Sequence, residues 1–389
     1  MKILFSSWPA HGHLLPMLPM ARAAVGDGHE VVVASGADLT AVIERHELTA
    51  RVTGSTLAQA YETAAAANRG SGLTELFGQM DPQQAAAAAA RNLFGAAAVS
   101  RTRDLLALVD RWRPDLMVHD TLELGAPTAA QIAGIPHAMH SYGPLVPNQG
   151  EFATAIGAAL VDAGLPDPIP GVFAAPYLDV CPPGLQPAGT DPWTDVIPVR
   201  PSAGEVPPGE TLPAAFAALP HPTTVYLTLG TVTNEQPAIF RAVLDACARF
   251  PVNVVLTTGP GVDPASVAGG RPGVLARQYL SQALVLPHCA AVVSHCGAGT
   301  MFGALSHGLP QLCLPQGTDQ PFNAAAVARA GAGLVLAPDQ VNVDSVARAL
   351  EQVLGDRAVR ASAAGLKAVI DGRPTPAAAL RTLIDRLPR

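Results

Sequence analysis

Two histidines lie near the start of the chain, in the stretch WPAHGHLLP at residues 8–16. They are His11 and His13. An imidazole titrates near neutral pH, so either ring could take a proton from a hydroxyl group. The stretch follows an apolar run at 2–5 that predicts a strand, and it precedes a segment at 14–24 that predicts a helix. The sequence therefore offers a general base in a loop at the carboxyl end of a first strand.

A carboxylate that could orient this base ends a later strand. The run DLMVHD at 115–120 predicts a buried strand that finishes at Asp120. Because ligand sites form at the carboxyl ends of parallel strands, Asp120 is expected at the same edge of the sheet as His11 and His13. The carboxylate would accept a hydrogen bond from the ring and stabilise the imidazolium as it forms. His119 should point the opposite way, into packing.

A second group of small and polar residues lies in VVSHCGAGTMFGALSHGLPQLCLPQGTDQPFNAAAVA, residues 292–328. Gly297 and Gly299 would let the backbone approach a ligand closely. A helix expected to begin near Thr300 would offer free amides and a positive dipole end, which suit a diphosphate. His295 could donate to a phosphate oxygen, and Thr300 could cap the helix.

One strand later, Asp319 and Gln320 offer a carboxylate and an amide that suit sugar hydroxyls. Each residue also has a structural interpretation taken singly. His295 could be a core histidine, Asp319 a helix N-cap and Gly299 a plain turn residue. Their order within one segment favours a site for a diphosphate and a sugar.

The elements that must position these groups alternate in both halves of the chain. Buried strands that alternate with helices predict a parallel, doubly wound sheet in each half, and a proline-rich stretch at 166–222 separates them. The expected strands are 2–5, 29–35, 115–120, 136–141, 224–231, 252–259, 273–280, 290–297, 310–316 and 333–336. The expected helices are 14–24, 126–133, 236–249, 300–307 and 321–330, with a C-terminal helix pair at about 343–386.

Composition limits the classes of protein. The 389 residues exceed what one core of about 250–300 residues holds, so two domains are expected. A net charge of −7 disfavours a nucleic-acid surface, and the sequence has no run of about 18 apolar residues that would insert in a membrane. Five cysteines without a CxxC pair indicate a reduced, cytoplasmic protein. The chain has no Asp-x-Asp, which disfavours a metal-bound diphosphate.

Five ordered stretches carry a family resemblance, and together they span essentially the whole chain. They are GHLLPMLPMARA, PDLMVHDTLELGAPTAAQIAGIPHAMHSYGP, VYLTLGT, RQYLSQALVLPHC and residues 292–328. The chain resembles the nucleotide-sugar glycosyltransferases of the GT-B fold, and more narrowly the bacterial enzymes that glycosylate polyketides, enediynes and macrolides. An α/β fold is expected, with two Rossmann-like domains facing across a cleft. The acceptor domain would be 1–205, the donor domain 206–373, and a helix within 374–389 would cross back.

The resemblance also implies roles. His13 matches the general base and Asp120 its partner, while His11 is a structural or acceptor-contacting residue. Tyr279 matches an aromatic that stacks on the nucleobase, and Ser281 stands where the family usually has proline. The implied donor-binding residues are Gly230, Thr231, Tyr279, Gln282, His295, Gly297, Gly299, Thr300, Asp319, Gln320 and Asn323. The expected acceptor-binding residues are His11, Phe77, Tyr142 and Phe152.

The expected reaction is an inverting transfer of a sugar to a hydrophobic aglycone, without a cofactor or metal. The resemblance favours a dTDP-deoxysugar donor, with a UDP-hexose as the alternative. An epimerase on the same frame would need further carboxylates, and a non-catalytic auxiliary protein would lack the base or the donor motif. The expected partners are the nucleotide sugar and the aglycone, with no nucleic acid and no stable membrane insertion. A homodimer is one alternative to a monomer.

Overall fold

The computed structural model describes residues 1–67, 82–146, 149–187, 193–201, 203–230 and 236–387. The chain divides into two compact units. The first comprises Met1–Val180, Ala188–Val199 and Pro374–Arg389, and the second comprises Cys181–Pro187 and Arg200–Arg373. Compared with the ranges expected from the sequence, residues 181–187 and 200–205 lie in the second unit.

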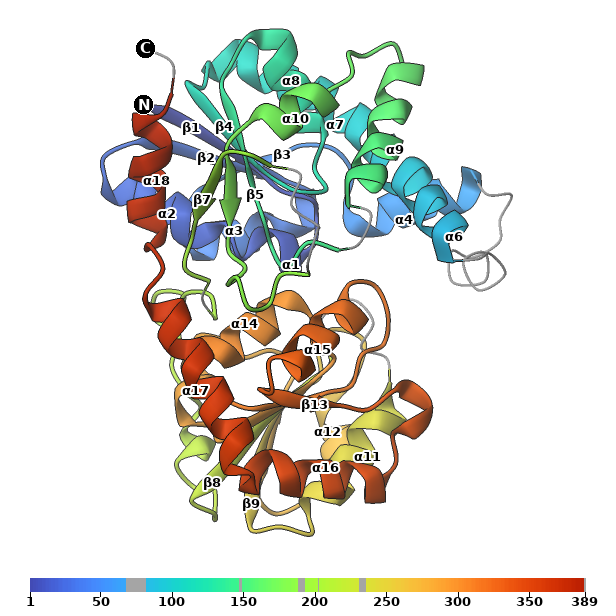
Figure 1. Ribbon diagram of the computed structural model, residues 1–389, viewed down its shortest axis with the longest axis vertical. Helices are drawn as coiled ribbons and strands as arrows, with labels where there is room; N and C mark the ends of the chain where they lie inside the picture. Colours follow the sequence, from blue (N-terminus) through green and yellow to red (C-terminus); the bar gives the residue numbers. More distant parts are fainter. Residues whose placement is uncertain (68–81, 147–148, 188–192, 202, 231–235, 388–389) are drawn as a thin grey trace. The chain divides into compact units, whose positions relative to one another are not determined.

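The first unit is built on a parallel sheet (Figure 1). Seven strands among its described residues follow the order β3-β2-β1-β4-β5-β6-β7. They are β1 (Lys2–Ser6), β2 (Glu30–Ser35), β3 (Thr49–Val52), β4 (Leu116–Asp120), β5 (His137–His140), β6 (Tyr177–Asp179) and β7 (Val196–Pro198). The helices are α1 (His11–Leu14), α2 (Leu18–Gly26), α3 (Thr40–Arg45), α4 (Leu57–Ala67), α6 (Pro82–Ala89), the π-helix η2 (Ala90–Gly95), α7 (Ala96–Trp112), α8 (Gly125–Ala133), α9 (Gln149–Asp162), α10 (Ile169–Ala174) and α18 (Pro376–Asp385).

The second unit repeats the same winding. Its parallel sheet has six strands in the described residues, in the order β10-β9-β8-β11-β12-β13. They are β8 (Thr223–Thr228), β9 (Val252–Thr257), β10 (Val274–Arg277), β11 (Ala291–Ser294), β12 (Gln311–Cys313) and β13 (Gly333–Val335). The helices are α11 (Pro237–Cys247), α12 (Pro264–Ala268), α13 (Gln282–Val285), α14 (Ala298–Ser306), α15 (Gln320–Arg329), α16 (Val343–Gly355) and α17 (Arg357–Asp371).

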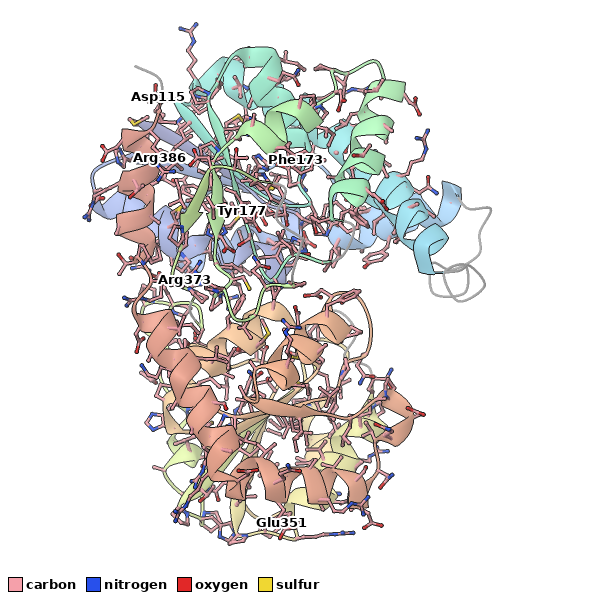
Figure 2. All side chains as sticks on the ribbon, viewed as in Figure 1. Asp115, Phe173, Tyr177, Glu351, Arg373 and Arg386 are labelled. Carbon is pink, nitrogen blue, oxygen red and sulfur yellow. The ribbon has the colours of Figure 1, made fainter. Side chains whose placement is uncertain are left out.

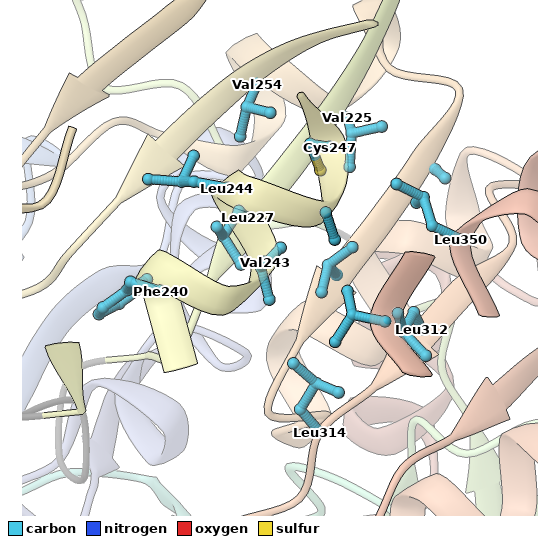
Figure 3. Close-up of a cluster of buried hydrophobic side chains, with 14 of the residues drawn as sticks. Val225, Leu227, Phe240, Val243, Leu244, Cys247, Val254, Leu312, Leu314 and Leu350 are labelled. Carbon is cyan, nitrogen blue, oxygen red and sulfur yellow. The ribbon is translucent and has the colours of Figure 1, made fainter. Parts of the chain in front are cut away.

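Both faces of the second sheet are buried, which explains why its strands read as continuous apolar runs. Side chains alternate along each strand, so Val225 and Leu227 pack on one face with Phe240 of α11 and Leu350 of α16 (Figure 3). Tyr226 points to the other face, where it packs with residues of α13 and α14.

Two expectations for the chain's course are wrong. The proline-rich stretch is more than a connector, because β6 and β7 lie within it and extend the first sheet. Its Trp193 ring stacks on Tyr177 with centroids 4.3 Å apart and tilts against Phe173 at 5.2 Å; Figure 2 labels both partners. The C-terminal segment holds three helices, since Asp356 ends α16 and caps α17 by accepting from the Ala358 amide at 2.7 Å.

Helix α18 belongs to the first unit although it follows the whole second unit in sequence. Its buried face presents Leu380 and Leu383, both without exposed surface. On its outer side, Arg381 Nε lies 3.0 Å from Asp27 Oδ2 at the end of α2. Arg386, labelled in Figure 2, pairs with Asp195 before β7.

Candidate active site

Each sheet reverses its strand order at one pair of strands, β1 with β4 in the first unit and β8 with β11 in the second. Ligands of such sheets bind outside the carboxyl ends of the strands at this switch point. His13 and Asp120 follow β1 and end β4. Gly230 and His295 follow β8 and β11. The residues singled out in the sequence therefore lie at the two switch points.

The predicted contact between His13 and Asp120 is present. His13 Nδ1 donates to Asp120 Oδ1 at 3.0 Å. The expected loop is instead the short helix α1, which contains His13 and ends before Pro16. With Nδ1 bound to the carboxylate, the neutral ring keeps its lone pair on Nε2. The hydrogen bond thus fixes the tautomer and the orientation of the His13 ring.

Asp120 is fully buried, and three donors satisfy its carboxylate. Besides His13, the Leu122 amide donates to Oδ1 at 2.8 Å and the Trp8 amide donates to Oδ2. Burial alone would raise the pKa of Asp120, but the His13 ring and these two amides together hold that pKa below its usual value. The carboxylate is therefore ionised at neutral pH.

The expected acceptor residues fall into different environments. The Tyr142 ring lies beside His13, with centroids 4.1 Å apart. His11 is partly buried, and burial lowers its pKa, with an opposing effect from Asp38. Phe152 packs on the helical core against Phe94 at 5.5 Å. Phe77 lies outside the described residues.

Three further histidines lie on β4 and β5; His119 and His140 are buried, and His137 is partly buried. His119 Nδ1 donates to the Asp120 carbonyl at 3.0 Å, and His119 Nε2 accepts from His137 Nδ1 at 3.2 Å. His140 Nδ1 donates to the Ser141 carbonyl at 2.6 Å. His119 points into packing as expected. Of the two alternatives for His137 and His140, core or acceptor pocket, His140 lies in the core, whereas His137 is partly buried and its role stays a prediction.

These histidines predict loss of stability in acid. Burial lowers the pKa of His119 to about 3 and that of His140 to about 4. An unfolded histidine titrates near ~6.5, so below that pH only the unfolded chain binds the protons. The stabilisation from each neutral buried histidine is fully present above about pH 6.5. As the pH falls below this value, the free energy of unfolding decreases by up to about 1.4 kcal/mol per pH unit for each histidine. Urea unfolding at pH 7.5, 6 and 5 measures this slope. The His119→Gln variant should give a shallower slope, and an equal slope would contradict the assignment.

In the second unit, two glycines let the His295 ring pack against the backbone. A Cβ atom at Gly230 would lie 2.6 Å from His295 Nε2, and one at Gly297 would lie 2.5 Å from it. Gly230 also has a φ of 81°, a conformation that favours glycine. Burial lowers the pKa of His295 to about 4, against an opposing effect of Asp319, so the ring is a neutral hydrogen-bond donor. Thr231, the neighbour expected to contact phosphate, lies outside the described residues.

Helix α14 begins two residues earlier than expected. Gly297 occupies its N-cap position, so the prediction that Thr300 caps the helix is wrong. Thr300 instead accepts a hydrogen bond from Gln282 Nε2 at 2.9 Å, which joins α14 to α13. Gly299 lies in the exposed first turn, and a Cβ atom there would meet nothing within 4 Å. The first-turn amides of a helix have no partner within the helix, so these groups could donate to an anion.

A hydrogen-bonded turn precedes α15. Asn323 Nδ2 donates to Asp319 Oδ2 at 2.7 Å and to the Cys296 carbonyl at 3.1 Å, which ties this turn to the start of α14. Gln320 Oε1 accepts from the Gln316 amide at 2.7 Å, so the Gln320 side chain shapes the turn. Asp319 occupies the N-cap position of α15, but its side chain makes no capping bond.

Some functional groups could not be read from the sequence. The Trp8 and Leu122 donors to Asp120 are backbone amides, which leave no side-chain signal. The Tyr279 side chain is exposed, as a stacking platform requires.

Among the described residues, no three His, Cys, Asp or Glu side chains cluster as metal ligands. Across the same part of the chain, every helix is too short or too polar to span a membrane.

Two parallel-sheet, Rossmann-like units with polar groups at both switch points are the architecture of the GT-B class. Comparison with known proteins narrows this class. The models for the N-terminal and C-terminal domains of erythromycin biosynthesis protein CIII-like proteins match residues 22–200 and 241–385. The L-demethylnoviosyl transferase of Streptomyces niveus is 32% identical, over 97% of this chain and 96% of its own length.

A solved structure of a spinosyn rhamnosyltransferase superposes with a TM-score of 0.80 at 26% identity, over 99% of this chain and 100% of the other. Structures of that enzyme with thymidine diphosphate and with the spinosyn aglycone give TM-scores of 0.78 and 0.79. The chain belongs to the erythromycin biosynthesis protein CIII-like family of bacterial natural-product glycosyltransferases.

Proposed function

We propose that this glycosyltransferase moves a deoxysugar from a thymidine-diphosphate sugar to a hydrophobic natural-product aglycone, with inversion and without a metal ion. The hydrogen bond between His13 and Asp120 at the first switch point carries this proposal. It supplies an oriented base for deprotonating the acceptor, which is what a single displacement at the anomeric carbon requires.

The transfer is one balanced step. The acceptor oxygen forms a bond to the anomeric carbon while the bond from that carbon to the diphosphate oxygen breaks. The acceptor proton passes to His13 Nε2, and the buried Asp120 carboxylate stabilises the imidazolium. Attack opposite the leaving group inverts the anomeric centre.

The second unit would stabilise the departing diphosphate. The first-turn amides of α14 and the neutral His295 ring provide donors near a positive dipole end. These groups would supply the positive potential that a metal ion provides elsewhere. Asp319, held by Asn323, would accept from a sugar hydroxyl. The complex of the spinosyn rhamnosyltransferase with thymidine diphosphate supports the choice of nucleotide.

The direct test offers the protein thymidine-diphosphate and uridine-diphosphate sugars with a panel of aglycones, and follows the products by mass spectrometry. Sugar transfer from the thymidine donor, with the opposite anomeric configuration in the product and undiminished by a chelator, is expected. Transfer only from the uridine donor would overturn the nucleotide assignment. Retention of configuration would overturn the single displacement.

Tyr279 provides a separate test of the nucleotide site. Its exposed ring is expected to stack on the thymine base, so Tyr279→Ala should weaken thymidine diphosphate binding about tenfold. The Tyr279→Phe variant keeps the ring and should bind as the wild type does. Isothermal calorimetry distinguishes the two. Equal affinities for all three proteins would contradict the stacking role.

A further inference from the structure

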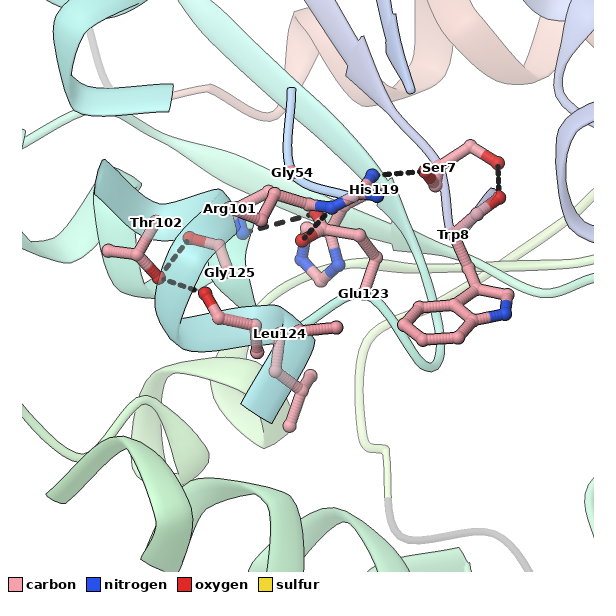
Figure 4. A network of polar contacts seen from close by, with 12 residues as sticks. Ser7, Trp8, Gly54, Arg101, Thr102, His119, Glu123, Leu124 and Gly125 are labelled. Atoms are coloured by element: carbon pink, nitrogen blue, oxygen red, sulfur yellow. Dashed lines mark hydrogen bonds and ion pairs between the residues drawn. The ribbon is translucent and has the colours of Figure 1, made fainter. Parts of the chain in front are cut away.

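One peptide group connects the His13–Asp120 pair to a buried arginine. The amide of Trp8 donates to Asp120 Oδ2. The carbonyl of Ser7, at the other end of the same peptide group, accepts from Arg101 Nη1 (Figure 4). Hydrogen bonds arranged in such a chain polarise one another. The guanidinium charge therefore strengthens the amide that holds the carboxylate.

Burial of the Arg101 side chain carries a desolvation penalty, because its guanidinium group is charged. Its side chain comes from α7 and is 1% exposed. Two glycines give it room, since a Cβ atom at Gly54 would lie 3.1 Å from Arg101 Nε and one at Gly125 would lie 3.2 Å from Arg101 Cβ. An apolar side chain of similar length would fill this space without the desolvation penalty of a charge. Packing alone does not explain a guanidinium here.

Glu123 lies beside this cation and is also buried. Its Oε1 lies 3.7 Å from Arg101 Nε, and its Oε2 accepts from the Ala126 amide at 3.1 Å. Burial raises the pKa of Glu123, and the Arg101 charge only partly opposes this effect. Glu123 is thus a partial counterion, and the guanidinium charge still acts on Asp120.

The other ionisable groups around these side chains are few in the described structure. Asp104 and Asp38 also act on Arg101, and each accepts a backbone amide, from Gly54 and Leu57 respectively. Around Asp120 lie His13 on α1, His119 on its own strand and His140 on β5. Because burial lowers the pKa of His119 to about 3 and of His140 to about 4, both stay neutral where the enzyme works.

We propose that Arg101 is a positioning residue for sugar transfer: acting through the Ser7–Trp8 peptide group, it keeps Asp120 ionised and aligned, and so keeps His13 able to take the acceptor proton. This inference rests on the proposed role of His13. It assigns a catalytic consequence to a side chain that touches neither substrate nor the base.

The pH profile of kcat/KM for the acceptor tests this proposal with Arg101→Met and Arg101→Lys. Loss of the charge in Arg101→Met should move the acid limb upward by about one pH unit and lower kcat/KM near that limb about tenfold. Arg101→Lys keeps the charge and should restore most of the wild-type profile. Thymidine diphosphate affinity should be unchanged in both, because the arginine lies in the first unit. An acid limb at the wild-type position in a folded Arg101→Met protein would overturn the proposal.

Glu123→Gln is the companion variant, and it tests the role of Arg101 if Arg101→Met does not fold. Removing this carboxylate leaves the guanidinium less neutralised, so the acid limb should move to lower pH, opposite to the arginine variant. An unmoved or raised limb would count against the proposal. The His13→Ala variant distinguishes a failure of the proposed base from a failure of the proposed role of Arg101. If that variant keeps activity, the proposed base fails; if it is inactive while the limb of folded Arg101→Met stays fixed, only the role of Arg101 fails.

Discussion

Replacing His13 with alanine is expected to lower kcat/KM for the acceptor by about 10²–10⁴-fold, the range of a general base in proton transfer. As the proposed base, the His13 imidazole would accept the hydroxyl proton, and the buried Asp120 carboxylate would stabilise the imidazolium that forms. The alanine variant keeps the helix α1 backbone but has no such group. Product formation followed by mass spectrometry at saturating donor gives the rate.

His11→Ala is the matched control, because it removes a second imidazole from the same short helix. It should lower kcat/KM far less than His13→Ala does, because it removes at most an acceptor contact, while both variants bind thymidine diphosphate as the wild type does in calorimetry. Full activity of His13→Ala with loss in His11→Ala would move the base to His11. Strong loss of donor binding in His13→Ala would show that the variant is damaged more widely.

Adding one methyl group at Gly299 should weaken thymidine diphosphate binding by about a hundredfold, the scale of a 1 Å misplacement in a binding site. A Cβ atom there meets no protein atom within 4 Å, so Gly299→Ala is expected to fold normally. The same methyl group would stand on the first turn of α14, where the diphosphate is proposed to approach the amides.

Gly365→Ala is the matched control for this substitution. Gly365 is also an exposed helical glycine, on α17, and a Cβ atom there likewise meets nothing within 4 Å. Both variants should gain up to about 1 kcal/mol of stability from replacing glycine in a helix. Only Gly299→Ala should lose nucleotide affinity in calorimetry. Wild-type affinity of Gly299→Ala would contradict diphosphate binding at this turn.

The sequence was informative where a physical constraint acts on side chains. Strands buried on both faces must be apolar throughout, so most strands of both sheets could be located. The meeting of His13 with Asp120 was predicted from the family motifs, and it has a physical reason: His13 follows β1 and Asp120 ends the neighbouring β4, so both lie at one edge of the sheet. His119 had to point away from Asp120, since neighbouring strand residues alternate in direction.

The sequence was less informative where backbone geometry or long-range contacts decide the outcome. Strands β6 and β7 have three residues each, too few to show a pattern among the prolines. Helix α14 starts at Ala298, and its N-cap residue is Gly297. Glycine has no side chain that could accept a capping hydrogen bond, so no capping pattern in the sequence predicts this start. The Gln320 side chain also accepts from the Gln316 backbone amide, a local bond that depends on the turn's conformation, while its contact with a sugar stays a prediction.

The position of α18 in the chain determines the order in which the units can be completed during synthesis. The first unit receives this helix only after Arg200–Arg373 have been translated. At about 5–20 residues per second, the ribosome needs roughly 10–35 s for that interval. Until then, the apolar surface of the first unit against which Leu380 and Leu383 pack is exposed on the nascent chain. The second unit can thus finish folding before the first, although translation begins with the first.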